Sequence, residues 1–345
     1  MIIALDATYS VGANLSGVGA YSRQMAFGLA AAHPEARFVF CYRPHRLLRA
    51  WLDRLPANAR RALLREERAP QQAELFHGLN QRLPKARLRR AVTTFHDLFV
   101  MTGEYSSAEF RARFREQAVE AAARSDRIIA VSRFTAEQAA ELLSVERSRL
   151  RVVHHGVRMP EEPPAEQQRE DVVLHVGAIQ RRKNLVRLVR AFERMPAGWR
   201  LVLIGSDGYG AEQVRRAIED SPRRASIETP GYLPARERDR WYARARIFAF
   251  PSLDEGFGMP VLEAMAWGIP VVASNRGALP EVSGDAAVLV DACDVEELGE
   301  ALRRFAADAE LRGEYARRGR ERASRFGWEE AVRQTWGVYQ ELLGG

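Results

Sequence analysis

Short apolar runs of strand length alternate with amphipathic stretches along almost the whole sequence. Ten runs rich in β-branched and aromatic residues cover residues 2–7, 37–42, 91–96, 127–132, 150–155, 172–177, 200–205, 246–252, 269–274 and 286–291. Stretches with helical spacing lie between them, for example over 21–32, 108–124 and 185–195. Strands that alternate with helices predict parallel sheets covered by helices on both faces. The sequence therefore predicts an α/β fold.

One segment interrupts this alternation. Residues 159–170, MPEEPPAEQQRE, contain three prolines and no apolar periodicity, which is typical of a linker. A chain of 345 residues has room for two domains. We expect doubly wound, Rossmann-like domains over 1–160 and 161–327, and a helix over 328–345 that packs back on the first domain. Two such domains facing each other across a cleft would bind ligands beyond the carboxyl ends of their strands.

Positive charge is concentrated in the first half of the chain. Residues 1–160 carry 25 basic and 15 acidic residues, a net charge of +10, whereas residues 161–345 carry 27 and 30, a net charge of −3. Residues 43–90 alone have a net charge of +9. This asymmetry predicts a polyanionic partner for one region, and nucleic acid, anionic lipid and a phosphorylated acceptor all fit it.

The basic stretch also contains an apolar stripe at helical spacing within residues 43–68. The stripe consists of Leu47, Leu48, Trp51, Leu52 and Leu55. It fits either a helix on an anionic membrane surface or a core-facing stripe with a solvated arginine face. The nearby aromatic residues form no evident stacking platform, so a nucleic-acid partner is not favoured.

Other features of the chain indicate its setting. No run approaches the roughly 18 apolar residues that a membrane span needs. The N-terminal MIIALDATYS has the pattern of a first strand and not of a signal peptide. The two cysteines, Cys41 and Cys293, form no CxxC pair. We therefore expect a reduced, cytoplasmic setting.

The most specific motif is residues 247–268, IFAFPSLDEGFGMPVLEAMAWG. A buried strand ends there at Ser252, a short loop follows, and Pro260 opens a helix. Gly256 and Gly258 would let the loop backbone approach a ligand closely. The pattern predicts a loop-to-helix device at the carboxyl end of a strand.

Two carboxylates, Glu255 and Glu263, flank this device, and Glu263 is expected in the first helical turn. The amides over 259–262, at the start of the helix, would face an anion. An isolated pair of glutamates is more simply explained as acids near a helix N-terminus. The whole loop favours a binding site in which Glu263 accepts hydrogen bonds from a vicinal diol such as a ribose.

In this context, EGFGMPVLEAMAWGIPVVAS, the sequence resembles the retaining glycosyltransferases of family 4, which have the GT-B fold. The resemblance covers most of the chain and is strongest over 172–300. It implies that Glu263 holds the ribose of a nucleotide-sugar donor and that Glu255 contacts the transferred sugar. The loop contacts to sugar hydroxyls and phosphate would come from Gly256, Phe257, Gly258, Met259, Val261 and Leu262.

A second motif, VGAIQRRKNLVRLVRAF (176–192), places Arg182 and Lys183 after a strand, where positive charge could offset a leaving diphosphate. A solvated basic loop is the alternative, although Lys183 is one of only two lysines in the chain. The motif resembles the family's diphosphate-binding turn. Many members have arginine where this chain has Ala178, and either Arg181 or Arg182 could substitute for it.

A glycine-containing segment follows the first strand. In residues 14–30, Gly17 and Gly19 precede a helix, but the long gap from strand 2–7 and Ser22 in place of a third glycine argue against a dinucleotide fingerprint. The resemblance implies a flexible glycine loop beside the donor phosphates and the acceptor. A plain loop is the other explanation.

Two further segments match the family. His96 and Asp97 follow a strand in TTFHDLF; a single histidine is more often structural, but the resemblance implies that His96 contacts the transferred sugar. GYLP at 231–234 resembles the edge strand that flanks the donor base. This resemblance implies main-chain contacts near Tyr232 and Leu233.

Together these features favour a retaining, metal-independent hexosyltransferase that needs no cofactor. No Asp-x-Asp motif is present, so we expect no divalent metal on the diphosphate. The family resemblance implies a front-face reaction in which the leaving phosphate takes the acceptor's proton. We expect catalytic roles for Glu255, His96 and Lys183.

The sequence is similar to the mannosyltransferase-type branch that assembles O-antigen or exopolysaccharide. This similarity implies GDP-mannose as the first candidate donor and a UDP-sugar as the second. The acceptor would be a glycan or a polyprenyl-diphosphate-linked glycan at the inner face of the membrane, with residues 43–90 as the membrane contact. A sugar-nucleotide epimerase, a phosphorylase and a non-catalytic membrane-surface or nucleic-acid binder of the same fold remain alternatives.

Overall fold

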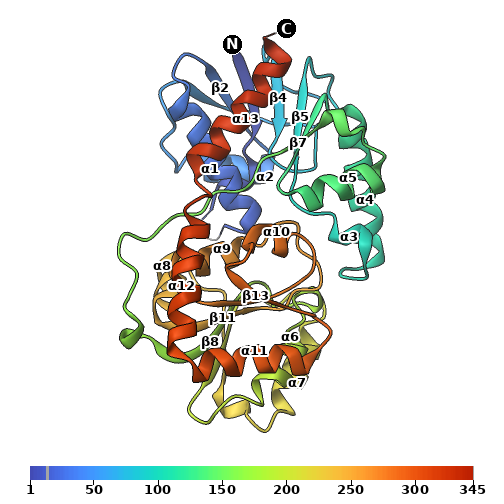
Figure 1. Cartoon of the computed structure of the whole chain (residues 1–345). Helices are drawn as coiled ribbons and strands as arrows, with labels where there is room; N and C mark the ends of the chain where they lie inside the picture. Colours follow the sequence, from blue (N-terminus) through green and yellow to red (C-terminus); the bar gives the residue numbers. More distant parts are fainter. Residues whose placement is uncertain (13–14, 345) are drawn as a thin grey trace. The chain divides into compact units, whose positions relative to one another are not determined.

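The computed structural model of the chain describes residues 1–12 and 15–344, which form two α/β units (Figure 1). Unit 1 comprises Met1–Thr102, Ala108–Gly156 and Phe326–Gly345, and unit 2 comprises Gly103–Ser107 and Val157–Arg325. Each unit is built on one parallel sheet with helices packed against it. The predicted fold class, with two doubly wound domains, is therefore confirmed.

Unit 1 contains a seven-stranded sheet in the order β3-β2-β1-β4-β5-β6-β7. Its strands are β1 (Ile2–Asp6), β2 (Arg37–Tyr42), β3 (Ala59–Leu63), β4 (Leu75–Gly78), β5 (Ala91–Phe95), β6 (Arg127–Ala130) and β7 (Leu150–Val152). All neighbouring strands are parallel; for example, Ile3 of β1 pairs with Phe38 of β2 and with Leu75 of β4. Because the first strand lies inside the sheet, the connections reverse direction between β1 and β4.

The helices of unit 1 come from both ends of the sequence. They are α1 (Gly17–Ala32), α2 (Pro44–Ala50), α3 (Phe99–Thr102), α4 (Ala108–Arg124), α5 (Arg133–Leu143) and α13 (Trp328–Leu343), with 3-10 turns η1 (Thr8–Ser10) and η2 (Arg147–Arg149). Helix α13 packs against α1 (Figure 1) and contributes Trp336 and Tyr339 to the core of unit 1. Gly156 permits this return, because a Cβ there would lie 2.5 Å from the Trp328 nitrogen.

A buried chain of uncharged groups ties α13 to the sheet. Nδ1 of His77 in β4 lies 2.6 Å from the Tyr339 hydroxyl, and its Nε2 lies 2.8 Å from Oγ1 of Thr94 in β5. Thr94 Oγ1 lies 2.9 Å from the hydroxyl of Tyr21 in α1. Burial lowers the pKa of His77 to about 3, so the imidazole is neutral.

The structure corrects the expectation of a helical stripe through residues 43–68. Helix α2 ends at Ala50, and residues 59–63 form the edge strand β3. Leu47 and Leu55 pack against the core of unit 1. The other three members of the stripe are exposed: Leu48 by 84%, Trp51 by 67% and Leu52 by 87%. The core-facing interpretation thus fits Leu47 and Leu55, whereas Leu48, Trp51 and Leu52 are exposed, as the membrane interpretation requires.

Unit 2 contains a six-stranded parallel sheet in the order β10-β9-β8-β11-β12-β13. Its strands are β8 (Glu170–Val176), β9 (Arg200–Ile204), β10 (Ile227–Gly231), β11 (Ala245–Phe250), β12 (Val271–Ser274) and β13 (Ala287–Val290). The register pairs Leu174 of β8 with Val202 of β9 and with Phe248 of β11. The connections of this sheet reverse direction between β8 and β11.

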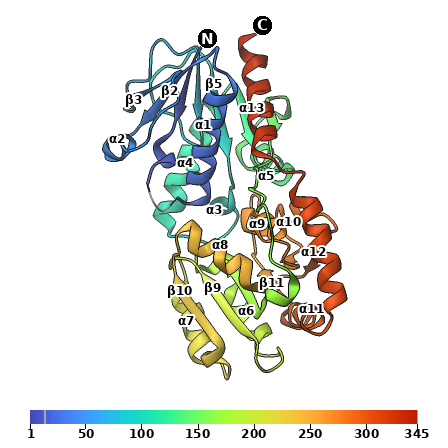
Figure 2. The same ribbon diagram turned by 90° about the vertical axis from the view of Figure 1, so that its left-hand side faces the viewer.

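The helices of unit 2 are amphipathic and pack on this sheet. They are α6 (Leu185–Phe192), α7 (Ala211–Glu219), α8 (Ala235–Arg244), α9 (Met259–Ala266), α10 (Leu279–Ser283), α11 (Val295–Ala307) and α12 (Ala309–Ala323), with 3-10 turns η3 (Glu166–Gln168), η4 (Arg181–Lys183) and η5 (Arg224–Ser226). Helices α6, α7 and α11 share a core with β8, β9 and β11. Helix α9 packs against α10 and α12, as Figure 2 shows.

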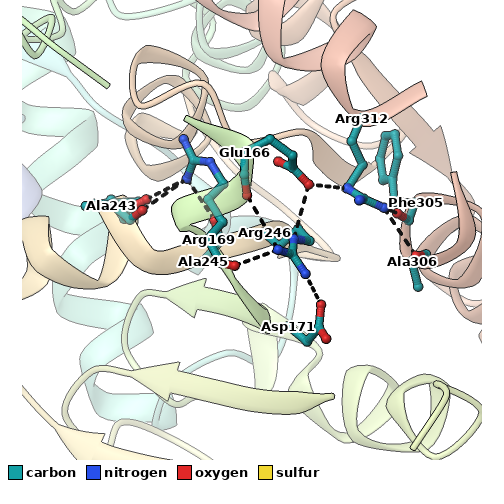
Figure 3. Close-up of polar contacts among 10 residues, drawn as sticks. Glu166, Arg169, Asp171, Ala243, Ala245, Arg246, Phe305, Ala306 and Arg312 are labelled. Carbon is teal, nitrogen blue, oxygen red and sulfur yellow. Dashed lines mark hydrogen bonds and ion pairs between the residues drawn. The ribbon is translucent and has the colours of Figure 1, made fainter. Parts of the chain in front are cut away.

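Arginines anchor the beginning of unit 2 (Figure 3). The Arg169 guanidinium donates to the carbonyl oxygens of Ala245 at 2.8 Å and Trp267 at 2.5 Å, which lie at the C-terminal ends of α8 and α9. Glu166 forms ion pairs with Arg246 at 3.1 Å and Arg312 at 2.7 Å. These contacts fix the predicted linker residues 166–169 on unit 2.

In the described part of the chain, no helix combines the length and apolar character needed to cross a membrane.

Candidate functional site

The switch point of unit 2 brings together two segments that the sequence singled out. Residues 177–183 follow β8, and residues 251–258 follow β11, its neighbour in the sheet. In open α/β sheets, ligands bind beyond the carboxyl ends of the strands at such a reversal. Arg182, Lys183 and Glu255 all lie in these two segments.

These three residues form one buried charge cluster, in which each residue is only 7% exposed. Oε1 of Glu255 lies 2.8 Å from Nη1 of Arg182 and accepts a hydrogen bond from Nζ of Lys183. Arg182 also donates to the carbonyl oxygen of Asp254. Nζ of Lys183 lies 4.6 Å from the ring centroid of Phe250, a cation–π contact. The three side chains carry two positive charges and one negative charge, so the cluster attracts anions.

The local chain geometry turns both cations toward Glu255. The 3-10 turn η4 is followed by Asn184 in the left-handed conformation, with φ of 60°. Its side-chain amide donates to the carbonyl oxygens of Pro251 at 3.0 Å and Ala292 at 2.6 Å. Asn184 therefore joins the segment after β8 to the segment after β11. The asparagine itself was a signal for this turn, since asparagine is among the few residues that adopt the left-handed conformation readily.

Electrostatics fix the charge state of Glu255. Burial acts to raise the pKa of its carboxyl group, but the neighbouring charges of Arg182 and Lys183 outweigh burial and lower the pKa to about 2. The carboxylate is therefore ionised at neutral pH. It can orient and stabilise a ligand, and it has no proton to donate.

The structure distinguishes the two arginines that could replace the one absent at Ala178. Arg182 is buried beside Glu255. Arg181 instead lines a surface cavity of about 320 Å³ between α6 and α7, together with Gly210 and Gln213. Arg182 is thus the arginine at the switch point, and its contact with phosphate stays a prediction.

Two glycines allow the loop after β11 to pack closely on its neighbours. Gly258 has φ of +100°, and a Cβ there would lie 2.5 Å from Cδ2 of Leu279 in α10. Gly277 has φ of +62°, and a Cβ there would lie 2.6 Å from the carbonyl oxygen of Glu255, which accepts a hydrogen bond from the Ala278 amide at 2.9 Å. Gly277 therefore supports the backbone of Glu255. The sequence analysis missed it because no local motif marks it.

Glu263 was expected in the first helical turn, but the structure places it after that turn. Helix α9 begins at Met259, so Glu263 is its fifth residue. The Tyr242 hydroxyl of α8 donates to Oε2 of Glu263 at 2.8 Å, and Nη2 of Arg238 lies 3.7 Å from Oε1. Burial raises the pKa of Glu263, whereas Arg238 and the Tyr242 hydrogen bond oppose that effect. Neither Tyr242 nor Arg238 was predicted from the sequence.

The other predicted loop residues differ in how far their side chains are exposed. The side chains of Phe257, Val261 and Leu262 are buried, with 4%, 0% and 1% exposure, so only their backbone could contact a ligand. The Val261 amide is already bonded to the Gly258 carbonyl at 2.9 Å. Met259 is half-buried at the start of α9.

The predicted base-flanking segment lies at the edge of the sheet. Strand β10 is the terminal strand of unit 2 and ends at Gly231, with φ of +78°. Tyr232 follows it and is 39% exposed, and Leu233 is half-buried. An edge position is compatible with main-chain contacts, and their ligand stays a prediction.

His96 of unit 1 is held on both ring nitrogens by its own unit. Its Nε2 donates to the Leu79 carbonyl at 2.9 Å, and its Nδ1 lies 3.3 Å from Nε2 of His155. The ring also contacts that of Tyr21, with centroids 4.6 Å apart. Burial lowers the pKa of His96 to about 4, so the imidazole is neutral. These contacts fit a structural histidine, and a sugar contact stays a prediction.

Gly17 and Gly19 lie in the first turn of α1 and not in a loop before a helix, which corrects that expectation. The side chain of Ser16 caps the helix by accepting from the Gly19 amide. A Cβ at Gly19 would lie 2.8 Å from the Tyr9 carbonyl oxygen, so close packing on η1 explains this glycine. Asn14, the first residue of the predicted segment, lies outside the described residues.

Within residues 1–12 and 15–344, no group of three or more His, Cys, Asp or Glu side chains could hold a metal ion. Metal independence stays a prediction, because it concerns the diphosphate-bound state.

Comparisons with known protein families match both halves of the chain. The profile described as "Glycosyltransferase Family 4" matches residues 16–159, and that described as "Glycosyl transferases group 1" matches residues 160–322. One relative, "O-antigen chain mannosyltransferase B" of Escherichia coli, is 33% identical over 284 residues. The match covers 78% of this chain and 74% of that relative.

Solved structures share the fold of both units. Sucrose-phosphate synthase from Thermosynechococcus elongatus matches with a TM-score of 0.80 and 23% identity, over 100% of this chain and 99% of that one. HepE of Anabaena, solved in complex with UDP, matches with a TM-score of 0.74 and 16% identity, over 99% of each chain. At these identities the likeness establishes the fold, which is GT-B, and leaves the substrate open.

Proposed function

This chain belongs to the family 4 glycosyltransferases, and from that premise we propose that it transfers a hexose, mannose as the first candidate, from a nucleotide-diphosphate sugar. The acceptor is a glycan or a polyprenyl-diphosphate-linked glycan in O-antigen or other polysaccharide synthesis. The observation that carries the proposal is the buried cluster of Arg182, Lys183 and Glu255 at the switch point of unit 2.

The charge of this cluster suits a departing diphosphate. When the bond between the anomeric carbon and the phosphate oxygen breaks, negative charge grows on the diphosphate and positive charge grows on the sugar. Glu255 offsets one of the two cations, so one positive charge of the Arg182–Lys183 pair is left to stabilise the leaving group. We propose that these side chains do the electrostatic work without a divalent metal.

The state of Glu255 favours a retaining, front-face reaction. Its Oε1 accepts from both Arg182 and Lys183, and such hydrogen bonds weaken a carboxylate as a nucleophile. Its low pKa also prevents it from serving as a general acid. In the proposed reaction, Glu255 orients the sugar and stabilises its positive charge, and the leaving phosphate accepts the acceptor's proton.

The remaining donor contacts follow the family resemblance. Glu263 would bind the ribose, and the backbone from Gly256 to Leu262 would contact the phosphates and the sugar. Tyr232 and Leu233 would flank the base. Of the unit 1 residues, His96 would contact the transferred sugar, and Gly17 and Gly19 would lie beside the donor phosphates and the acceptor.

The donor base is proposed from the relatives. The mannosyltransferase relative supports mannose as the sugar, and the family resemblance implies GDP as its carrier. HepE, which was solved with UDP, keeps a UDP-sugar as the second candidate. The test is a calorimetric titration of GDP-mannose, UDP-glucose and ADP-glucose in EDTA. GDP-mannose should bind most tightly, and NMR of the transfer product should show a retained anomeric configuration. If none of the three binds, or if binding requires a divalent cation, the proposal fails.

We further propose that unit 1 contacts an anionic membrane surface through Leu48, Trp51 and Leu52, three side chains that unit 1 leaves exposed. The Arg61 guanidinium lies 5.0 Å from the ring centroid of Trp51, so positive charge accompanies the apolar group. This combination fits an interfacial contact with anionic lipid. The enzyme would then work at the cytoplasmic face of the inner membrane, next to a lipid-linked acceptor.

Vesicle binding tests this contact. The triple variant L48S/W51S/L52S should bind vesicles of phosphatidylglycerol and phosphatidylcholine about tenfold more weakly, because burial of apolar side chains is lost. The variant V119S removes an exposed apolar side chain from α4 and should bind as the unchanged protein does. Equal binding by the triple variant would contradict the membrane contact.

A further inference from the structure

The buried end of the Glu263 carboxylate is held by a tyrosine that no motif marks. Tyr242 is 0% exposed, and its ring packs against Phe248 of β11 with centroids 5.9 Å apart. Its hydroxyl donates to Oε2 of Glu263 at 2.8 Å. The Glu263 side chain keeps 23% of its surface exposed. One oxygen of the carboxylate is thus fixed from inside the unit, while part of the group stays accessible from outside.

The number of acceptor positions leaves room for a diol. An ionised carboxylate offers about four acceptor positions on its two oxygens. The Tyr242 hydroxyl occupies one position on Oε2. The hydroxyls of a vicinal diol require two more, so Glu263 can bind them without releasing Tyr242. This geometry makes Tyr242 a fixed support and not a competitor.

Arg238 is the competitor for the same carboxylate. Its Nη2 lies 3.7 Å from Oε1 of Glu263, too far for a hydrogen bond. Its Nε is buried and has no hydrogen-bond partner among the described residues. A small rotation of the Glu263 side chain would allow a bidentate pair with this guanidinium. Such a pair would use the acceptor positions that a diol needs, and the Tyr242 hydrogen bond opposes that rotation.

The helices that carry these side chains are joined at their C-terminal ends by Arg169. The Arg169 guanidinium donates to the carbonyl oxygens of Tyr242 at 3.2 Å and Ala245 at 2.8 Å, at the end of α8. It also donates to the carbonyl oxygen of Trp267 at 2.5 Å, at the end of α9. Because one guanidinium joins both helix ends, it limits how far the two helices that carry Tyr242 and Glu263 can move apart.

From this arrangement we propose that Tyr242 is a positioning residue, which holds the Glu263 carboxylate away from Arg238 and toward the 2′- and 3′-hydroxyls of a nucleotide ribose. The inference rests on the proposed role of Glu263 in donor binding. Tyr242 acts through Glu263 and does not touch the nucleotide. Its contribution is therefore specific to the ribose hydroxyls.

The test compares the binding of GDP with that of 2′,3′-dideoxy-GDP, which carries the same phosphates and base. The ratio of the two dissociation constants measures the ribose contribution alone, because effects on the phosphates cancel. Calorimetry is performed on the full chain and on the variants E263Q, Y242F and Y315F. Y315F is the matched control, since Tyr315 lies in α12 of the same unit and packs on Phe305 of α11. The same pair of uridine nucleotides is used if UDP binds more tightly than GDP.

The expected results separate the inference from the proposed function. The unchanged protein and Y315F should prefer GDP strongly, E263Q should lose that preference, and Y242F should lose about fivefold to tenfold of it. If E263Q keeps the preference, or if neither ribonucleotide binds the unchanged protein, the proposed role of Glu263 fails and the inference falls with it. If E263Q loses the preference and Y242F keeps it, only the inference is overturned.

A double variant distinguishes positioning from packing. In Y242F/R238M the competing guanidinium is absent, so part of the lost preference for GDP should return. A tyrosine that only filled space would not be rescued by removal of a partly exposed arginine. Absence of rescue would overturn the competition between Arg238 and the diol, and thermal unfolding of each variant shows whether it is folded.

Discussion

The two units have parallel sheets that reverse direction in the same way, and each holds a buried polar network near the reversal, but these two networks differ in charge. In unit 2 the groups are ions, with Glu255 between Arg182 and Lys183. In unit 1 they are neutral, with His77 between Tyr339 and Thr94. Both sets are almost fully buried.

The difference in charge changes the free-energy cost of burying the two networks. Removing ions from water costs far more free energy than removing hydroxyls and a neutral imidazole, and a buried ion pair rarely stabilises a fold more than apolar packing would. A network of neutral hydrogen-bonded groups is thus the expected means of docking a helix such as α13. A buried charge cluster fits the proposed chemistry, which needs fixed charge. We therefore expect a structural role for the neutral network of unit 1 and a reactive role for the cluster of unit 2.

We expect the greatest loss of activity when Lys183, one of the two cations of the cluster, is removed. K183A should reduce kcat by about 10²- to 10³-fold, because a preorganised charge is lost while Arg182 still pairs with Glu255. Steady-state transfer assays measure this change. K85A removes the only other lysine, which is exposed, and should leave kcat unchanged. An unchanged kcat in K183A would contradict a catalytic role for the cluster.

The second prediction concerns the stability of unit 2. E255Q should reduce the free energy of unfolding by about 3 kcal/mol, because two buried cations lose their anion. Urea unfolding followed by tryptophan fluorescence measures the change. E314Q, which breaks an exposed pair with Arg318, should cost at most about 0.5 kcal/mol. Equal costs for both variants would mean that the cluster is effectively solvated.

The ionisation of Glu255 also makes the stability of the folded protein depend on pH. The pKa of Glu255 is lowered to about 2 in the folded protein, from an ordinary value of 4.5. Its contribution to stability is therefore complete above pH 4.5 and is lost as the pH falls toward 2. E255Q should abolish that part of the acid dependence.

The third prediction concerns the neutral network of unit 1, which should affect stability in a different pH range. The pKa of His77 is lowered to about 3, so below pH 6.5 the unfolded chain binds a proton that the folded chain cannot bind. Stability should thus fall as the pH drops from 6.5 toward 3. In H77N the loss between pH 7 and pH 5 should be smaller by about 2 kcal/mol. Urea unfolding at both pH values tests it, and an unchanged loss would show that His77 is not the titrating group.

The smallest effect is expected at the end of the neutral chain. Y339F removes the hydroxyl that contacts His77 and should cost about 1 kcal/mol. Hydrogen exchange of the α13 amides should accelerate accordingly, with little change in kcat. A loss of activity as large as that of K183A would contradict the structural role of this chain.

The sequence predicted the central strands well because each is a continuous apolar run. All ten predicted runs contain strands, but three strands, β3, β4 and β10, lie outside these runs. Strand β3, ARRAL, is an edge strand with two arginines, and β4, LFHG, has only four residues and contains His77. The burial of His77 depends on Thr94 and on Tyr339, the latter 262 positions away, so no local pattern reveals it.

The same limit applies to the site. The motifs around Lys183 and Glu255 identified residues that the structure brings together, since both motifs follow strands that become neighbours. Tyr242 and Gly277 escaped notice because they act on the loop and on α9 from other elements. The roles of such residues depend on tertiary contacts, which cannot be predicted from local sequence motifs.

The position of α13 in the sequence has a consequence during protein synthesis. Residues 328–343 complete the core of unit 1, but the ribosome makes them only after all of unit 2. Until then the growing chain presents the apolar side of α1 without the covering side chains of Trp336 and Tyr339. Unit 2 can acquire its core first, although its sequence begins later, and the N-terminal unit must wait for translation to reach its last helix.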